Sequence, residues 1–595
     1  MTILRKYIMK SYKRYIICFT TLLCLACGKD FLEKQPDENL DIEAVFSERQ
    51  YAEGYLTAVY NHLPTMQDPI FTGGCDEMEI TFTGNYAHRL NSGAWSSADG
   101  YPDYWMNMYQ AIRKANIFLE NVDQVPMIEA DRTLWKGEAT FLRAFFHFTL
   151  VKMYGAVPLV DRSIALSEDL SVLRRDPVDE VIAFIVSECD KATDMLDWEV
   201  SPIHYGRITK PAAMALKAQA LLYLASPLFN GNPDFRNLID DHGRRLFPDH
   251  DANRWVAAAN AAKACIDGAE GHGYGLYYAA DNDPVKSYQE LFLDHHNREV
   301  LLARNKGIDA HYERCSNPIG YGGFSIYCPT QEMIDAYEMA NGQQPITGYN
   351  ADGSPIIDLS SGYQETGYTA TAHPKNYHPS GIRNMYVGRD PRFYASINYA
   401  GSIWKSRAVE FWNTGADGKQ RAVGSDYNIS GYLMKKFIDP TSNIPQNRFS
   451  LNTWITYRLG EQYLNYAEAL NEAEGPVTDV YKYVNAIRSR AGMPDLPPNL
   501  SKDNMRERIQ HERRIELAFE SHRYFDVRRW KTASNIENKP IHGMNIQAGT
   551  SLQDNAFYQR VLIERRIFVS PKHYLWPVQI WEIEKNPMLL QNPGW

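Results

Sequence analysis

Residues 131–154 read DRTLWKGEATFLRAFFHFTLVKMY, a long and strongly helical pattern. Apolar residues recur there at three- and four-residue spacing, which predicts a helix with a buried face. Gly155 follows directly and Pro158 comes soon after it, and this order is the usual signal for the end of a helix. The stretch therefore predicts a core helix that ends at Tyr154.

Further helical patterns lie on both sides of this stretch. We predict helices over 40–66, 105–123, 177–197, 210–226, 252–268, 453–474, 477–491 and 502–521. Several carry small residues that let helices approach closely, such as Ala212, Ala213 and Ala215. Paired helices of this kind are similar to tetratricopeptide (TPR) repeats, although no strict period is visible. The predicted fold class is all-α, with a TPR-like helical platform.

Residues 270–450 have a different character, being rich in Gly, Pro, Asn, Tyr and Ser. Within them, where long helical patterns are few, we predict a short helix over Glu332–Tyr337 and a strand over Phe393–Tyr399. Long irregular segments on a rigid scaffold often carry function. The predicted division is a helical part over 39–269, a loop-rich ligand-binding part over 270–450, and a second helical part over 451–595.

The N-terminus has the features of an export signal. Residues 1–26 hold five basic residues and no acid, and their apolar run Tyr15–Ala26 is too short to span a bilayer. The run ends at Cys27 in a sequence that resembles a bacterial lipobox. That resemblance implies a lipid on Cys27 and a tether over 27–38. The start could be Met1 or Met9.

Composition and charge exclude one class of partner. The chain has 595 residues and a formal net charge of −10, and without the five basic residues of 1–26 this becomes −15. Nucleic acid is not the expected partner, because phosphate binding needs a basic surface. The 38 Tyr and 12 Trp residues suit both packing and stacking on a ligand.

Four stretches together resemble the SusD/RagB family. They are Phe141–Leu159, Tyr457–Ala473, Arg513–Trp530 and the tail Leu575–Trp595, and Asp390-Pro391-Arg392 also matches. The chain departs from the family pattern at four positions, which are Gly460 for alanine, Ser521 for glycine, Gln579 for proline, and the final Trp595. We expect the charged residues of these motifs to form a structural framework, since arginine bonds carboxylates bidentately.

The resemblance implies four TPR-like helix pairs and an outer-membrane lipoprotein that faces the cell surface. It also implies capture of a glycan or a peptide beside a SusC-like TonB-dependent porin, over which such proteins close as a lid. We expect a glycan, an oligo- or polysaccharide, to be the ligand. A peptide-binding member of the family and a secreted glycoside hydrolase stay open as alternatives.

Ligand contacts are expected in the loops, because an aromatic platform with flanking polar groups suits sugars. The resemblance implies that the first loop, residues 76–101, supplies ligand contacts. The candidates there are Trp95, Asp76, Arg89, Asn91 and Tyr101. Trp95 could instead be a buried anchor for its loop. The second loop, residues 317–327, offers Tyr321, Phe324 and Tyr327. A weaker third cluster comprises Tyr363, Tyr368, His373, Tyr377 and His378.

No motif in the sequence predicts an enzyme, a cofactor or a metal site. Asp281-Asn282-Asp283 has Lys286 and Phe292 where an EF-hand loop needs glycine and glutamate. His511-Glu512 does not extend into an HExxH motif. The 72 acidic residues leave a glycosidase pair open without singling one out. Cys315 and Cys328 bracket a glycine-rich loop and could pair, or could both be buried thiols.

Overall fold

The computed structural model describes residues 41–595, apart from residues 66–68 and residue 166. The predicted signal peptide, Cys27 and the tether lie outside the described residues. In the described part of the chain, no helix is both long and apolar enough to cross a membrane.

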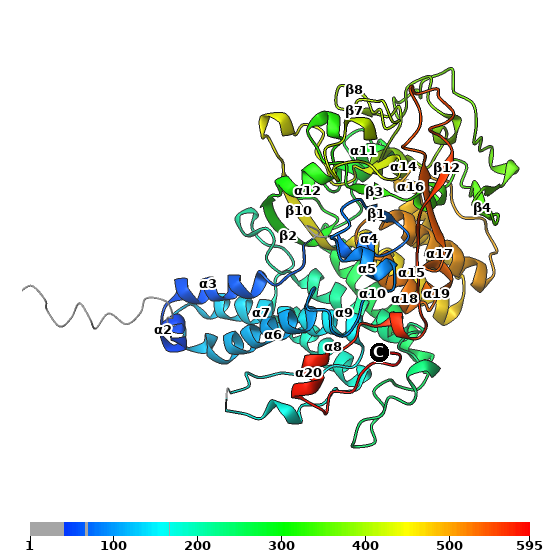
Figure 1. The fold of residues 1–595 in the computed structure, drawn as a ribbon. Helices are drawn as coiled ribbons and strands as arrows, with labels where there is room; N and C mark the ends of the chain where they lie inside the picture. Colours follow the sequence, from blue (N-terminus) through cyan, green and yellow to red (C-terminus); the bar gives the residue numbers. More distant parts are fainter. Residues whose placement is uncertain (1–40, 66–68, 166) are drawn as a thin grey trace, which may run out of the picture.

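Helices make up most of the regular structure (Figure 1). In chain order they are α2 (Ile42–Ser47), α3 (Arg49–Tyr60), α4 (Ile70–Gly73), α5 (Ala87–Asn91), α6 (Tyr104–Asn121), α7 (Glu129–Tyr154), α8 (Val178–Met195), α9 (Lys210–Ala225), α10 (Asn253–Gly271), α11 (Pro284–Glu290), α12 (Ala310–Cys315), α13 (Gln331–Ala336), α14 (Pro391–Ser396), α15 (Leu459–Glu474), α16 (Thr478–Arg490), α17 (Lys502–Glu516), α18 (Arg523–Arg529), α19 (Ala533–Ile536) and α20 (Ile580–Lys585).

The strands are short and pair two by two in antiparallel fashion in the described residues. The pairs are β1 (Met78–Ile80) with β3 (Tyr327–Pro329), β2 (Val300–Ile308) with β10 (Leu451–Arg458), β4 (Ile346–Tyr349) with β5 (Pro355–Ile357), β6 (Ile397–Tyr399) with β9 (Tyr432–Met434), β7 (Ile403–Trp404) with β8 (Arg407–Ala408), and β11 (Pro540–Met544) with β12 (Arg560–Arg565).

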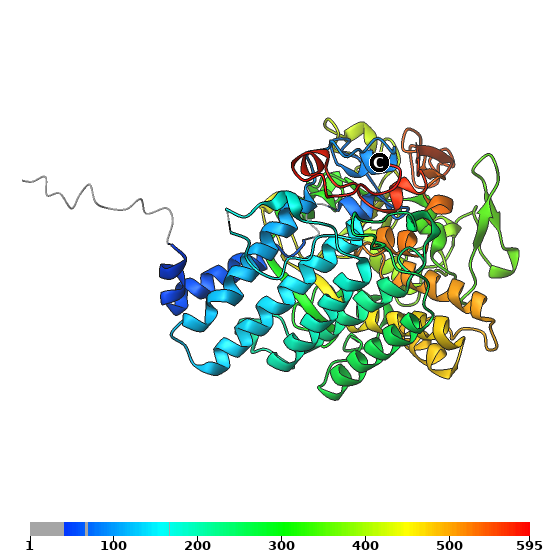
Figure 2. The same ribbon diagram turned by 90° about the horizontal axis from the view of Figure 1, so that it is seen from below.

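The long helices form one continuous platform. From α6 to α10, each long helix packs against the next one along the chain, and Figure 2 shows them side by side. Helix α10 also packs against α15, which in turn packs against α16 and α17. The N-terminal and C-terminal helices are thereby joined directly, although more than 180 residues separate α10 from α15.

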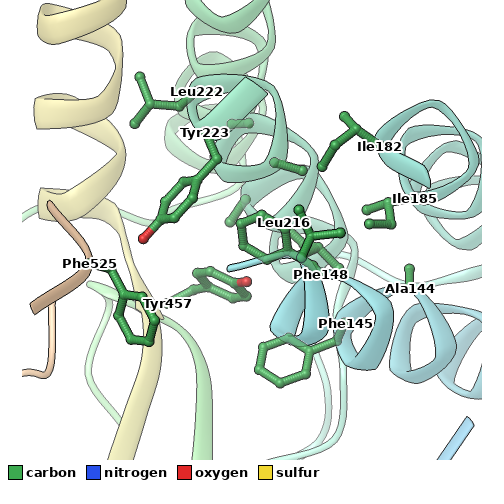
Figure 3. Close-up of a cluster of buried hydrophobic side chains, with 14 of the residues drawn as sticks. Ala144, Phe145, Phe148, Ile182, Ile185, Leu216, Leu222, Tyr223, Tyr457 and Phe525 are labelled. Atoms are coloured by element: carbon green, nitrogen blue, oxygen red, sulfur yellow. The ribbon is translucent and has the colours of Figure 1, made fainter. Parts of the chain in front are cut away.

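Two hydrophobic cores stabilise the molecule. The first lies in the helical platform, where Phe145 of α7, Tyr223 of α9, Tyr457 of β10 and Phe525 of α18 come together (Figure 3). The second lies in the loop-rich part and is dominated by aromatic residues such as Tyr386, Phe393 and Tyr432. The loop-rich part is therefore packed around a core of its own.

The charged residues of the C-terminal motifs are buried and paired, which confirms the expected framework. Glu516 accepts hydrogen bonds from Arg458 at 2.8 Å and from Arg392 at 3.0 Å, and it also pairs with Arg490. Arg513 pairs with Asp526 at 3.2 Å. Removing one partner of such a buried group leaves an uncompensated charge, so this network depends on all its members.

Four sequence predictions of local structure are wrong. The predicted helix over 40–66 is divided into α2 and α3, because Glu48 between them has an extended backbone. Residues 453–458 belong to strand β10 rather than to a helix, because the run Thr453–Tyr457 is β-branched or aromatic and pairs with β2. Residues 391–396 form helix α14, and only Ile397–Tyr399 is a strand. Helix α17 ends at Glu516, since Phe519 and Ser521 adopt left-handed conformations with φ of 64° and 63°.

Candidate functional site

Trp95 is a core residue in this structure. Its side chain is 2% exposed, and its ring centroid lies 4.6 Å from that of Trp595 and 5.1 Å from that of Trp576. The His573 ring packs against the Trp95 ring, with centroids 5.2 Å apart. Of the two interpretations open from the sequence, the structure places Trp95 as the buried anchor that ties the first loop to the C-terminal tail.

The polar candidates of the first loop also serve the framework. Asp76 is buried against Arg523 and Arg514, and Asn91 is buried and donates to the Gly73 carbonyl at 3.0 Å. Arg89 is half exposed and pairs with Asp99 at 2.9 Å. These side chains hold the shape of the loop and do not gather around one opening.

The second loop is joined to the first by a pair of strands. Ile80 of β1 lies opposite Tyr327 of β3, and Thr81 donates through its hydroxyl to the Tyr427 carbonyl at 2.8 Å. Tyr327 is buried by this pairing. Phe82, which follows Thr81 in the turn after β1, is 53% exposed. This turn, called the β1 turn, therefore presents an aromatic ring that the sequence did not single out. Its position directly after a short strand was the available signal.

Tyr321 and Phe324 remain partly exposed, but their rings are already covered on one side. The Arg407 guanidinium lies 4.5 Å from the Tyr321 ring centroid, and Tyr321 donates to the Trp404 carbonyl at 2.5 Å. Arg314 lies 5.8 Å from the Phe324 ring. Nearby, Cys315 and Cys328 are buried free thiols, and burial raises the pKa of each.

Tyr101 is the candidate that stands at a cavity. With 62% of its side chain exposed, it borders a cleft of about 580 Å³ between the helical platform and strand β10. We call this the platform cleft. Its walls come from the segment after α3, from α4, α6, α7, α9 and β10, and from residues 520–525. They include Phe71, Tyr104, Phe145, Tyr223, Trp454, Tyr457 and Phe525. Figure 3 shows how Phe145, Tyr223, Tyr457 and Phe525 converge from these elements.

Polar groups are interspersed among the rings of the platform cleft. Asn61 and Asn107 offer amide donors and acceptors there, and Lys152 offers an ammonium group. The Gln219 amide is engaged by Glu461 and Tyr457. The Lys152 Nζ lies 5.0 Å from the Phe525 ring centroid, and burial lowers the pKa of Lys152 to about 8. An aromatic cleft with a few convergent polar groups is the usual form of a small-ligand site.

The third aromatic cluster is divided by the structure. Tyr363 is buried, whereas Tyr377 stacks on His373 with ring centroids 4.3 Å apart and planes 9° from parallel. Tyr377 borders a separate pocket in the loop-rich part.

One group of residues in the described chain has metal-ligand spacing, namely Glu79, His88 and Glu564. Arg566 already donates to Glu79, and to Glu564 at 3.2 Å. The positive charge of the Arg566 guanidinium disfavours binding of a metal cation between these carboxylates. We therefore assign the cluster to ion pairs of Arg566 with Glu79 and Glu564.

The comparisons with known proteins agree with this architecture. The SusD family model matches residues 293–595, and a second model, described as starch-binding and associating with the outer membrane, matches residues 30–224. The chain belongs to the SusD family. A SusD-like protein, P25, of Formosa agariphila is 22% identical over 98% of this chain and 98% of its own length. A SusD-like protein of Bacteroides ovatus is 23% identical over 88% of this chain and 83% of its own length.

Solved SusD-family structures share the fold. A SusD-like protein from Bacteroides fragilis superposes with a TM-score of 0.74 at 27% identity, covering 94% of this chain and 100% of its own. A laminarin-binding SusD-like protein superposes with a TM-score of 0.57 at 19% identity, covering 92% of this chain and all of its own. At that identity the second likeness concerns the fold alone.

Proposed function

We propose that this SusD-family protein is a surface-exposed outer-membrane lipoprotein, anchored through a lipid on Cys27. In this proposal it binds an oligo- or polysaccharide and delivers it to a SusC-like TonB-dependent transporter, over which it closes as a lid. The helical platform, read as TPR-like, carries the site. The role is capture, so it needs no catalytic residue and no cofactor.

The observation that carries this proposal is the platform cleft. A sugar ring has apolar C–H faces and a rim of hydroxyl groups. Tyr101 at the mouth of the cleft can stack on the C–H faces, while Asn61 and Asn107 can bond the hydroxyl groups. We choose this cleft over the Tyr321 and Phe324 loop because arginines already cover those rings.

The test is calorimetry of the protein against a panel of neutral polysaccharides, with Tyr101→Ala as the diagnostic variant. Loss of a stacked ring should weaken binding by about tenfold. Tyr278→Ala is the matched control, since Tyr278 is also well exposed at 47% and does not border the cleft. Unchanged affinity in Tyr101→Ala, with loss in Phe82→Ala, would place the glycan on the β1 turn instead.

The same samples separate the alternatives. A peptide-binding member of the family would bind peptides from a parallel panel and no polysaccharide. A glycoside hydrolase would release reducing ends from the bound glycan, whereas a capture protein leaves it intact.

Anchoring and delivery need cells that also produce the candidate transporter. Cys27→Ser should abolish labelling by a palmitate analogue and release the protein from the membrane fraction. Co-purification of the lipidated protein with the transporter would support delivery, and its absence with the lipid intact would contradict it.

A further inference from the structure

A second pocket, of about 460 Å³, lies in the loop-rich part. It is bordered by α11, the loop 375–379, α14, strands β6 and β7, and Lys435, which directly follows β9. Figure 1 shows α11, α14 and β7 close together at the loop-rich end of the molecule. Three lysines border this pocket, Lys286, Lys375 and Lys435, and we call it the lysine pocket.

Two of the three lysines have a carboxylate partner. Lys286 pairs with Asp281 at 2.5 Å, and Lys375 pairs with Asp283 at 3.5 Å. Asp283 also accepts the Tyr377 hydroxyl at 2.7 Å and the backbone N–H groups of Val285 and Lys286 at 3.0 and 3.1 Å. The acids of the pocket are therefore engaged by groups other than Lys435.

Lys435 has no such partner. Among the described residues, its ammonium group makes no ion pair and no hydrogen bond, although the side chain is half-buried at the pocket. Burial lowers the pKa of Lys435 to about 8, with no neighbouring acid to oppose the effect. A half-buried cation loses part of its hydration, and without a partner that loss is not compensated. An anion in the pocket would supply the missing partner.

Aromatic rings border the same space. Tyr377 is held by its stack on His373 and by its bond to Asp283. The buried Tyr394 ring lies 5.7 Å from that of Tyr377, centroid to centroid, and supports it at the pocket. The partly exposed Tyr377 ring provides a surface for a sugar, whereas a free inorganic ion would make no use of it.

We propose that the lysine pocket binds an anionic group carried on a saccharide, a uronate carboxylate or a sulfate ester, through Lys435. The lysine makes a charge-assisted hydrogen bond to the anion, and Tyr377 contacts the sugar ring that carries it. This inference rests on the proposed function only in that the anion is part of a glycan.

The first test measures the reactivity of Lys435 directly, by labelling of amines in the intact protein and mass spectrometry of its peptides. Galacturonate or N-acetylglucosamine 6-sulfate should slow the labelling of Lys435 several-fold, while galactose has no effect. Lys585, whose side chain is 69% exposed and which does not border the pocket, is the internal control and should not respond. Protection by inorganic sulfate alone would overturn the assignment to a saccharide, and lack of protection by any anion would overturn the site.

The second test compares trigalacturonate with its methyl ester, which keeps the sugars and removes the charges. Lys435→Met should weaken binding of the acid by about tenfold and leave binding of the ester unchanged, and Lys585→Met, at an exposed lysine outside the pocket, should alter neither. Lys435→Met should also melt no lower than the wild type, because it removes an unpaired cation. Equal binding of the acid by both variants would overturn the proposal.

These results are separable from those on the proposed function. Tyr101→Ala reports on neutral glycans in the platform cleft, and the protection of Lys435 by an acidic sugar does not depend on that residue.

Discussion

The Asp76 carboxylate accepts two hydrogen bonds from the Arg523 guanidinium, at 2.8 Å from Nε to Oδ1 and at 3.0 Å from Nη2 to Oδ2. The residues are 447 positions apart in the chain. Arg514 contacts the same carboxylate at 2.8 Å. Burial alone would raise the pKa of Asp76, but the charges of Arg514 and Arg523 hold it well below its ordinary value. The pair therefore fastens the first loop to the C-terminal motif.

We predict that Asp76→Ala destabilises the protein by about 3–5 kcal/mol, because the buried Arg523 and the partly buried Arg514 lose their counter-charge. Urea unfolding measures the change. The contribution of Asp76 is complete above the ordinary aspartate pKa of about 4, and it is lost as the pH falls toward the lower folded-state value. Asp267→Ala, which breaks a surface pair with Lys263, should change stability far less. Equal losses in the two variants would contradict this role for Asp76.

Gly460 departs from the family pattern for a steric reason. A Cβ atom on Gly460 would lie 2.7 Å from both Arg458 Nη1 and Glu299 Oε1, which are buried and bonded to each other. We predict that Gly460→Ala destabilises the protein by about 1–3 kcal/mol, measured by urea unfolding. Gly54→Ala is the control, since Gly54 lies in α3 with open space around it and alanine is the better helix former. Stabilisation by both changes would refute the steric explanation.

Ser521 occupies a position where the family pattern has glycine, and its φ of 63° explains that preference. A side chain in the left-handed region costs roughly 1–2 kcal/mol, and the Ser521 hydroxyl recovers little through its 3.3 Å contact with Thr72. We predict that Ser521→Gly raises the free energy of unfolding by up to about 1 kcal/mol. Ser489→Gly, at an exposed position in α16, should lower it. A loss of stability in Ser521→Gly would show that the hydroxyl matters more than the backbone.

Glu77 should make stability fall as the pH rises. Burial, together with the neighbouring Asp76 charge, raises the pKa of Glu77 to about 8, and its Oε1 atom has no hydrogen-bond partner among the described residues. The folded state therefore holds a proton that the unfolded state releases above its ordinary pKa. The contribution falls by about 1.4 kcal/mol per pH unit from about pH 5 to 8.

Glu77→Gln tests this titration, because glutamine mimics the protonated acid and does not ionise. The variant should be about as stable as the wild type at pH 5 and more stable at pH 8. Urea unfolding across this range gives the difference between the two slopes. Parallel curves for the two proteins would contradict the raised pKa.

Local pattern alone determined most of the helical platform. The predicted helix over 131–154 matches α7, and that over 210–226 matches α9, because apolar spacing and end signals act within a few turns of one helix. The charged residues around Arg513 and Glu516 also predicted a structural framework correctly. Family membership followed from the same motifs.

Tertiary structure alone decided where the candidate residues lie. The sequence did not distinguish a Trp95 that stacks on a ligand from one that packs on Trp595. The fold of the C-terminal tail decides this, because it places Trp595 against Trp95 and buries it. Residues 453–458 became a strand because β2, more than 140 positions earlier, supplies the pairing. The platform cleft and the lysine pocket are built from segments far apart in the chain, and no local spacing records such contacts.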